Sequence, residues 1–534
     1  MSFTLTFGQE GPCATAQVVW SVDGQTYNFR SDNNFIGWIS TIFTVADVVN
    51  GGGGDLLISS DQLPPVQGGV GNLWAEYGVG GSVIGNARGE GAVDWQQNRN
   101  LATQVASSNY STIGGGFGST ASGVYSTVAG GKSNTASAYA STVGGGMQNT
   151  ASGAYSKVGG GANNTASAQS TTVGGGESNS ASSDLATIGG GKSNTASGNY
   201  GTIGGGGNNT ASADYTKVGG GKGNTASGNY ATVGGGLDNI ASGGNATVAG
   251  GRQNSASSNA TVGGGQYNTA SGNYGTIGGG GNNTASVYFA TVGGGTGNTA
   301  SGLYATIGGG AVNSASNLYA TVCGGDSNTA SSDYATVGGG TGNTASGASA
   351  TVGGGGNNTA SGGYATIGGG KTNTASGYVA TVIGGQNSLA DRYGMVAHAS
   401  GRFSVDGDAQ AVEFVARNTT VGVTPAVLFL DGASTRFTVT NNSLLSGILT
   451  ISGFNTTGTK NAVYQRSVLI TNVGGTTTLA HVSTVSTDHE TDATWAVTIT
   501  ADNATDSLNI SCTGSLLDTV AWVAVFRGLQ ILLP

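Results

Sequence analysis

Residues 218–232 read Val-Gly-Gly-Gly-Lys-Gly-Asn-Thr-Ala-Ser-Gly-Asn-Tyr-Ala-Thr, and Val233 begins the next copy of the same pattern. The β-branched residue that opens the stretch recurs at nineteen positions: Ile113, Val128, Val143, Val158, Val173, Ile188, Ile203, Val218, Val233, Val248, Val262, Ile277, Val292, Ile307, Val322, Val337, Val352, Ile367 and Val382. Every interval is fifteen residues except the fourteen between Val248 and Val262. A fixed short period sustained over this length is typical of a solenoid.

Each repeat is predicted to form one turn of a β-coil, with two short strands and two tight corners. Fifteen residues are too few for a helical repeat, and three glycines per repeat disfavour a helix by roughly 1 kcal/mol each. The segment 230–233 is expected to be the first strand, with Ala231 and Val233 inside and Tyr230 and Thr232 outside. The three glycines turn the first corner. Asn-Thr-Ala-Ser forms the second strand, and Ser-Gly makes the second corner.

The charged residues fall at a few positions of the repeat and so distinguish its inside from its outside. Positions four, five and eleven after the β-branched residue, together with the Thr position just before it, hold Lys132, Lys192, Lys222, Arg252, Lys371, Glu177, Asp326, Asp238, Asp184, Asp214, Asp333, Lys157 and Lys217. The Ala and Val positions hold no charge. Because an unpaired charge is costly to bury, the charged positions must face water.

Tyrosines form a second regular row, at one place in the repeat: Tyr125, Tyr155, Tyr200, Tyr215, Tyr230, Tyr274, Tyr304, Tyr319, Tyr334 and Tyr364. A single coil encloses only a thin line of Val, Ile and Ala, so several chains are expected to associate along their length. The tyrosine row is either that contact between chains or a cover on the solvent face of a strand.

The repeated Ala-Thr-Val-Gly-Gly-Gly-x-x-Asn-Thr-Ala-Ser-Gly units resemble the head repeats of trimeric autotransporter adhesins (YadA-like heads) and the same repeats in phage fibres. The resemblance covers about half of the chain. It implies a left-handed parallel β-roll in an obligate homotrimer.

The rest of the chain divides around this shaft, predicted at 111–394. Residues 1–85 are read as a small β-rich domain that docks onto a virion protein, or alternatively as a cap for the first turn. Residues 86–110 are a transition and cap. Residues 395–534 carry alternating segments between turns and are predicted to form a β-sandwich or jelly-roll tip. Within them, residues 415–418 and 428–432 are similar to C-terminal domains of phage fibre proteins.

Composition excludes several classes of function. The chain has 534 residues, 103 of them glycine, and its net charge of −9 is thinly spread, so no basic surface for nucleic acid is expected. Cys13, Cys323 and Cys512 are too scattered for a disulfide framework. A secretory signal, a run of eighteen apolar residues and coiled-coil heptads are all missing from the sequence, so membrane insertion is not expected. These departures from the adhesin pattern favour the phage fibre.

The sequence offers little chemistry. Gly-Lys-Ser at 131–133 and 191–193 and Gly-Lys-Thr at 370–372 lack the upstream glycine and following helix of a phosphate loop. His398, His481 and His489 are scattered, and a solvated loop is favoured over a metal site around Asp488, Glu490 and Asp492. No catalytic, cofactor-binding or metal-binding residue is assigned, and the chain is expected not to be an enzyme.

The predicted function is that of a virion fibre or tail-fibre subunit, a homotrimer that presents a receptor-binding tip to a host-surface glycan or protein. The receptor contact is expected within 395–534, with no residue assigned. A bacterial trimeric adhesin on the cell surface is the first alternative. A glycan-cleaving tailspike and an ice-binding solenoid with threonine ladders are the others.

Overall fold

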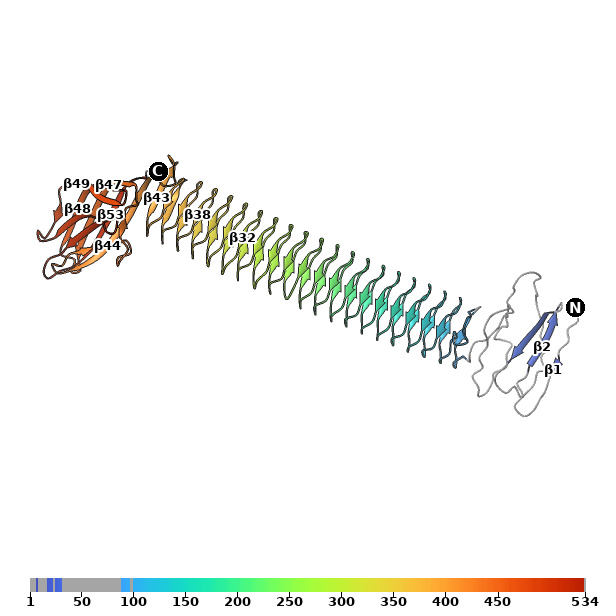
Figure 1. Ribbon diagram of the computed structural model, residues 1–534. Coiled ribbons are helices and arrows are strands. Elements are labelled where there is room, and N and C mark those ends of the chain that lie inside the picture. The colour runs from blue at the N-terminus through green and yellow to red at the C-terminus, as the bar shows by residue number, and fades with distance from the viewer. Residues whose placement is uncertain (1–5, 8–16, 23–24, 31–87, 97–98, 533–534) are drawn as a thin grey trace. The chain divides into compact units, whose positions relative to one another are not determined.

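The computed structural model describes residues 6–7, 17–22, 25–30, 88–96 and 99–532, and their regular elements are all strands (Figure 1). None of these residues belongs to a helix long and apolar enough to cross a membrane. The chain divides into two units, Met1–Gly160 and Gly161–Pro534.

In the first unit, β1 (Thr6–Phe7), β2 (Gln17–Val22) and β3 (Gln25–Arg30) pair antiparallel. The rest of the domain predicted at 1–85 lies outside the described residues. The repeats begin where β4 (Val93–Asp94) pairs in parallel with β5 (Thr112–Ile113). The parallel rows then continue through β7 (Thr127–Val128), β9 (Thr142–Val143) and β11 (Lys157–Val158), and through β6 (Thr120–Ala121), β8 (Thr135–Ala136) and β10 (Thr150–Ala151).

In the second unit the repeats form a parallel β-solenoid, as predicted (Figure 1). One row of odd-numbered strands runs from β13 (Thr172–Val173) to β41 (Thr381–Gln386). A second row of even-numbered strands runs from β12 (Thr165–Ala166) to β42 (Leu389–Ala390). Nearly every strand has two residues and pairs in register with the same residues of the next turn. For example, β19 (Lys217–Val218) pairs with β21 (Thr232–Val233).

The solenoid core consists of the predicted Val, Ile and Ala side chains. Val233, Ala231 and Ala226 are fully buried, as are their equivalents in the other turns, whereas charged positions such as Lys222 are exposed. The inside and outside of the coil therefore follow the alternation in the sequence, and this prediction is confirmed.

The prediction that Tyr230 belongs to a strand was wrong. The strand holds only Thr232 and Val233, and Tyr230 occupies the corner before it at φ +62. The backbone N–H of Ala231 donates to Gly228 O at 2.9 Å and closes a tight turn. This turn needs a residue in the left-handed region, which is sparsely populated by bulky side chains. Closure of the turn outweighs the β propensity of tyrosine.

The first corner depends on glycine, as expected. Gly221 has φ +86, and a Cβ there would collide with Gly236 O of the next turn. Only glycine combines this conformation with so close an approach of backbone to backbone.

Beneath this corner lies a ladder of buried asparagines, which the sequence did not predict. Asn224 donates from Nδ2 to Gly220 O and to Gly236 O, both at 2.9 Å, and its Oδ1 accepts the backbone N–H of Asn239 at 3.0 Å. The arrangement recurs in turn after turn. Each asparagine thus bonds carbonyl groups of two successive glycine corners and gives the buried backbone N–H of the next asparagine its partner.

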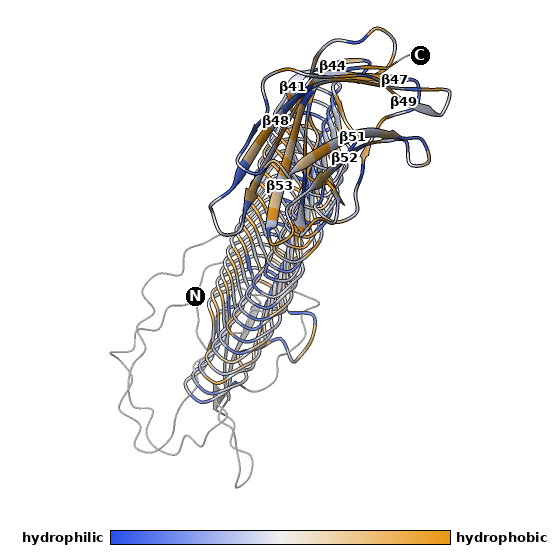
Figure 2. Cartoon of the chain, turned by 90° about the vertical axis from the view of Figure 1, so that its left-hand side faces the viewer, coloured by the Kyte–Doolittle hydropathy of each residue, from blue (hydrophilic) through white to orange (hydrophobic). Residues whose placement is uncertain are grey.

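At the end of the solenoid, β43 (Val396–Ser400) pairs in parallel with β41 and antiparallel with β44 (Ala409–Val421). The sheet continues antiparallel through β53 (Thr519–Leu532), β47 (Ser443–Asn455), β48 (Asn461–Val473) and β49 (Thr476–Thr484), and β50 (His489–Glu490) also pairs with β48. A second sheet contains β45 (Ala426–Val427), β46 (Phe437–Thr438), β51 (Ala496–Asp502) and β52 (Ser507–Thr513). Figure 2 shows β51 and β52 as a layer of their own.

Aromatic side chains fill the space between the two sheets. Phe437 lies 4.4 Å from Phe414 and 5.5 Å from Phe526 between ring centroids, and Trp495 lies 5.3 Å from Trp522. All five are buried. The predicted β-sandwich is confirmed.

Candidate functional site

The sandwich has one end that joins the solenoid and one end that does not. At the joined end, Gln410 contacts Leu389 of the last turn, and Gln530 accepts a hydrogen bond from Arg392 at 2.9 Å. At the other end, β44, β53 and β47 finish together at the pairs Val421–Thr519 and Asn455–Val520. The loops at this end, 422–425, 455–460, 491–495 and 514–518, are called the distal loops below.

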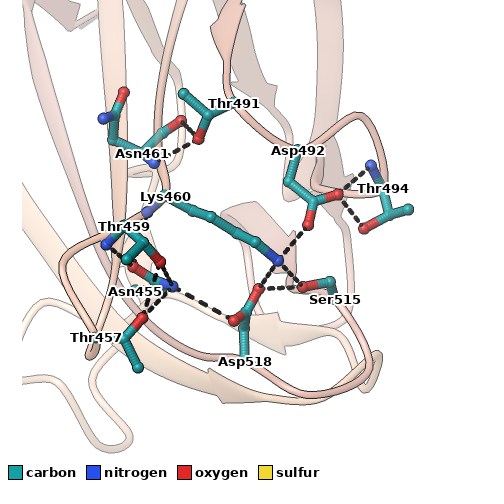
Figure 3. A network of polar contacts seen from close by, with 10 residues as sticks. All are labelled: Asn455, Thr457, Thr459, Lys460, Asn461, Thr491, Asp492, Thr494, Ser515 and Asp518. Atoms are coloured by element: carbon teal, nitrogen blue, oxygen red, sulfur yellow. Dashed lines mark hydrogen bonds and ion pairs between the residues drawn. The ribbon is translucent and has the colours of Figure 1, made fainter.

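A polar network ties three of the distal loops together (Figure 3). Lys460 Nζ donates to Asp492 Oδ2 at 2.8 Å and to Asp518 Oδ2 at 2.7 Å. The Ser515 hydroxyl donates to the same Asp518 oxygen, and Asn455 Oδ1 accepts the backbone N–H of Lys460 at 2.9 Å. Multiple partners of this kind hold the loops in one arrangement more firmly than a single exposed ion pair would.

The hydrogen bonds from Lys460 hold the pKa values of Asp492 and Asp518 below their usual range. Both carboxylates are therefore ionised at neutral pH. A glycosidase-type general acid requires a raised pKa, which this pair does not have. The pair serves to fasten the distal loops.

Beside this network the distal end exposes apolar side chains. Leu517 is 96% exposed and Leu516 73%, and Val421, Val423 and Phe454 are also exposed. The backbone N–H of Gly422 donates to Asp518 O at 2.9 Å, so the loops that carry these residues adjoin. Exposed apolar groups gathered beside a polar rim are typical of interaction surfaces.

The histidines and neighbouring acids considered from sequence are engaged separately. His481 contacts Ser483 and His489 contacts Asn461, each at 3.0 Å. Asp488 accepts from Arg466, and Glu490 accepts from Tyr464 at 2.7 Å. Within the described ranges, no three His, Cys, Asp or Glu side chains are grouped closely enough to hold a metal ion.

The solenoid carries the tyrosine row on its outer surface, at the second corner of many of its turns. Tyr274, Phe289, Tyr304, Tyr319 and Tyr334 stack in succession with ring centroids 4.8–5.3 Å apart. A shorter stack, Tyr200, Tyr215 and Tyr230, precedes it with spacings of 4.7 and 4.9 Å. The sequence predicted the row but not its position on a corner, which sets adjacent rings face to face.

Comparison with known proteins gives structural neighbours but no family. No protein-family model matches the chain, and no curated protein does. The resemblance to YadA-like heads therefore stays a prediction. Among solved structures, the chain matches tailspike protein gp49 from Acinetobacter baumannii bacteriophage Fri1, described as a capsular polysaccharide depolymerase. That match has 9% identity, 77% of this chain and 80% of that chain covered, and a TM-score of 0.21.

Two further phage tailspikes match at a similar level. For the tailspike of Acinetobacter phage vB_ApiP_P1, identity is 10%, coverage 76% and 82%, and the TM-score 0.19. For that of Acinetobacter baumannii phage AM24 the values are 8%, 78% and 72%, and 0.16. At these TM-scores the likeness assigns neither an activity nor a substrate to this chain.

The expectation that the chain is not an enzyme is nevertheless corrected. One of its structural neighbours is described as a capsular polysaccharide depolymerase, so the neighbours include an enzyme. No catalytic residue could be assigned from the sequence in the repeats or in 395–534, and the expectation rested on that absence alone.

Proposed function

We propose that this chain is a subunit of an external phage tail appendage that attaches to a host-surface glycan or protein through the distal loops. The observation that carries the proposal is the pair Leu516 and Leu517, which are 73% and 96% exposed at the end of the sandwich away from the solenoid. The network around Lys460 fixes the loop that carries them. A binding surface on loops held by a rigid scaffold is the usual arrangement for recognition.

The solenoid supports this proposal as a spacer. Hydrogen bonds of the two strand rows and of the asparagine ladder join each turn to the next. These bonds favour a stiff shaft that carries the sandwich at its end. β43 belongs to the sheets of both parts and couples them without a free linker.

Two parts of the proposal come from the sequence. The chain is proposed to form a homotrimer, and the domain at 1–85 is proposed to dock onto a virion protein. The first is tested by native mass: the chain has a mass of 51.9 kDa, and a homotrimer is expected at three times this value. A monomeric mass would overturn the homotrimer.

The binding proposal is tested with the labelled full chain on a panel of bacterial cells and on an array of purified bacterial surface polysaccharides. The double variant Leu516→Ser, Leu517→Ser should lose retention on the surface that holds the unmodified chain. Val473→Ser is the matched control because Val473 is an exposed apolar residue at the other end of the sandwich. Equal retention of all three proteins would refute the proposal. Newly released reducing ends are measured in the same incubations, since a depolymerase both binds and cleaves its glycan.

A further inference from the structure

The stack of Tyr200, Tyr215 and Tyr230 has a neighbouring cation that the longer stack from Tyr274 to Tyr334 lacks. The rings are nearly parallel, at 6° and 3° between planes, and each is roughly half exposed. Because the faces of Tyr215 are covered by its two neighbours, the stack presents ring edges and phenolic hydroxyls to solvent. These groups combine apolar contact with hydrogen bonding.

The cation is Lys217, which replaces the threonine that precedes the β-branched residue in most repeats. It lies in β19 between Thr202 of β17 (Thr202–Ile203) and Thr232 of β21. Its side chain is exposed, and no salt bridge in the described part of the chain includes it. The nearby carboxylate of Asp214 accepts the backbone N–H of Asn199 at 3.1 Å.

Lys217 and the three rings line one hollow. This open hollow on the solenoid surface has a volume of about 320 Å³ and is lined by Tyr200, Tyr215, Lys217, Tyr230 and Thr232. This lies at the lower end of the range for small-molecule sites. The hollow therefore offers one ammonium donor, several hydroxyls and apolar ring edges, all of which one small ligand can contact at the same time.

We propose that Tyr200, Tyr215, Lys217 and Tyr230 bind a carboxylated sugar unit of an acidic polysaccharide. The sugar carboxylate pairs with the Lys217 ammonium, while the sugar hydroxyls and C–H groups meet the tyrosine hydroxyls and ring edges. A simple inorganic anion would leave the apolar edges unused. A nucleic acid is disfavoured because the hollow has one cation, Lys217, whereas binding to a phosphate backbone draws on several lysines or arginines. The inference rests on the proposed function, because it gives the shaft a glycan contact separate from the distal loops.

The chain contains its own control for this site. Tyr304, Tyr319 and Tyr334 stack in the same way at 4.8 and 5.3 Å, but Thr321 occupies the place of Lys217. Lys217→Thr restores the common residue of the repeat and should fold normally. Thr321→Lys transplants the cation to the second stack. Tyr215→Ser is also compatible with the fold, because Ser349 holds the same corner position at φ +55.

The test measures binding of the full chain to four carboxylated polysaccharides (polygalacturonate, alginate, hyaluronan and polysialic acid), to fully methyl-esterified polygalacturonate and to inorganic phosphate. At least one of the four should bind, and Lys217→Thr should weaken that binding about tenfold or more, since a charge-assisted hydrogen bond is lost. Tyr215→Ser should weaken it as well, and Thr321→Lys should add a second site. The neutral ester and phosphate should not compete.

The site would be overturned if none of the four polymers bound the chain, or if Lys217→Thr bound as tightly as the unmodified chain. Competition by the ester or by phosphate as strong as that by the carboxylated polymer would also overturn it. A native mass that changes in the Lys217 and Tyr215 variants would instead make the stack a contact between copies of the chain. The double variant Leu516→Ser, Leu517→Ser should bind the carboxylated polysaccharide as well as the unmodified chain does. Failure of the tyrosine site and failure of the distal loops can therefore be distinguished.

Discussion

Replacing one asparagine of the buried ladder tests the physical basis of the shaft. Asn283 donates to Gly279 O and Gly295 O at 2.9 Å each, and its Oδ1 accepts Asn298 N–H at 3.0 Å. Asn283→Ala removes all three hydrogen bonds, at about 1 kcal/mol each. Gly295 O keeps the bond from Gly281 N–H, but Asn298 N–H loses this partner inside the solenoid. The expected loss is therefore about 3 kcal/mol in the free energy of local opening.

Hydrogen exchange read by mass spectrometry measures this opening free energy turn by turn. Protection should fall roughly 100-fold around residues 279–298 and recover in distant turns, because solenoid repeats contact only their neighbours. Asn282→Ser is the matched control, since Asn282 is exposed and Ser327 holds the equivalent position at φ +56. A loss no greater than in the control would refute the role assigned to the ladder.

Three further predictions concern other parts of the molecule. Gly295→Ala should lower the thermal unfolding midpoint of the solenoid, because Gly295 has φ +87 and an added Cβ would collide with Gly310 O. Gly294→Ala is the control and should leave the midpoint unchanged, because a Cβ on Gly294 has no atom within 4 Å. Folding lowers the pKa values of Asp492 and Asp518 from 3.8, so their contribution to stability is present above that pH and lost as the pH falls through the lowered values. The denaturant midpoint of the sandwich should therefore drop below about pH 4, and Lys460→Met should weaken this dependence. In a Cys13→Ser background, a thiol reagent at pH 8 should modify exposed Cys323 but not Cys512, whose pKa burial raises to about 12; modification of both in the native protein would contradict this.

The repeat made the solenoid predictable. Each position of the fifteen-residue unit is sampled many times, so an absence of charge at Ala231 and Val233 could be read as burial. The same repetition could not reveal the role of Asn224. An asparagine in an exposed strand and one buried beneath a corner have the same sequence pattern, and only the folded chain shows the hydrogen-bond partners of Asn224. Tyr230 was wrongly placed in a strand because the prediction used its β propensity alone. It did not include the turn closed by the hydrogen bond from Ala231 N–H to Gly228 O.

The sandwich was predictable only as a class. Its alternating strands were visible in the sequence, but the distal loops come from separate segments that the strand order brings together. Lys460 meets Asp492 and Asp518 across 32 and 58 residues of sequence, respectively. No local pattern encodes such a meeting, and the exposure of Leu517 is likewise set by the path of its loop.

The most direct test of the account is a hydrogen-exchange footprint of the full chain with and without the surface polysaccharide that retains it on the array. Added protection is expected in residues 514–518 and 455–460 of the distal loops, with the glycine corners of the solenoid unchanged. Protection confined to the solenoid, with the distal loops exchanging as in the free chain, would contradict it.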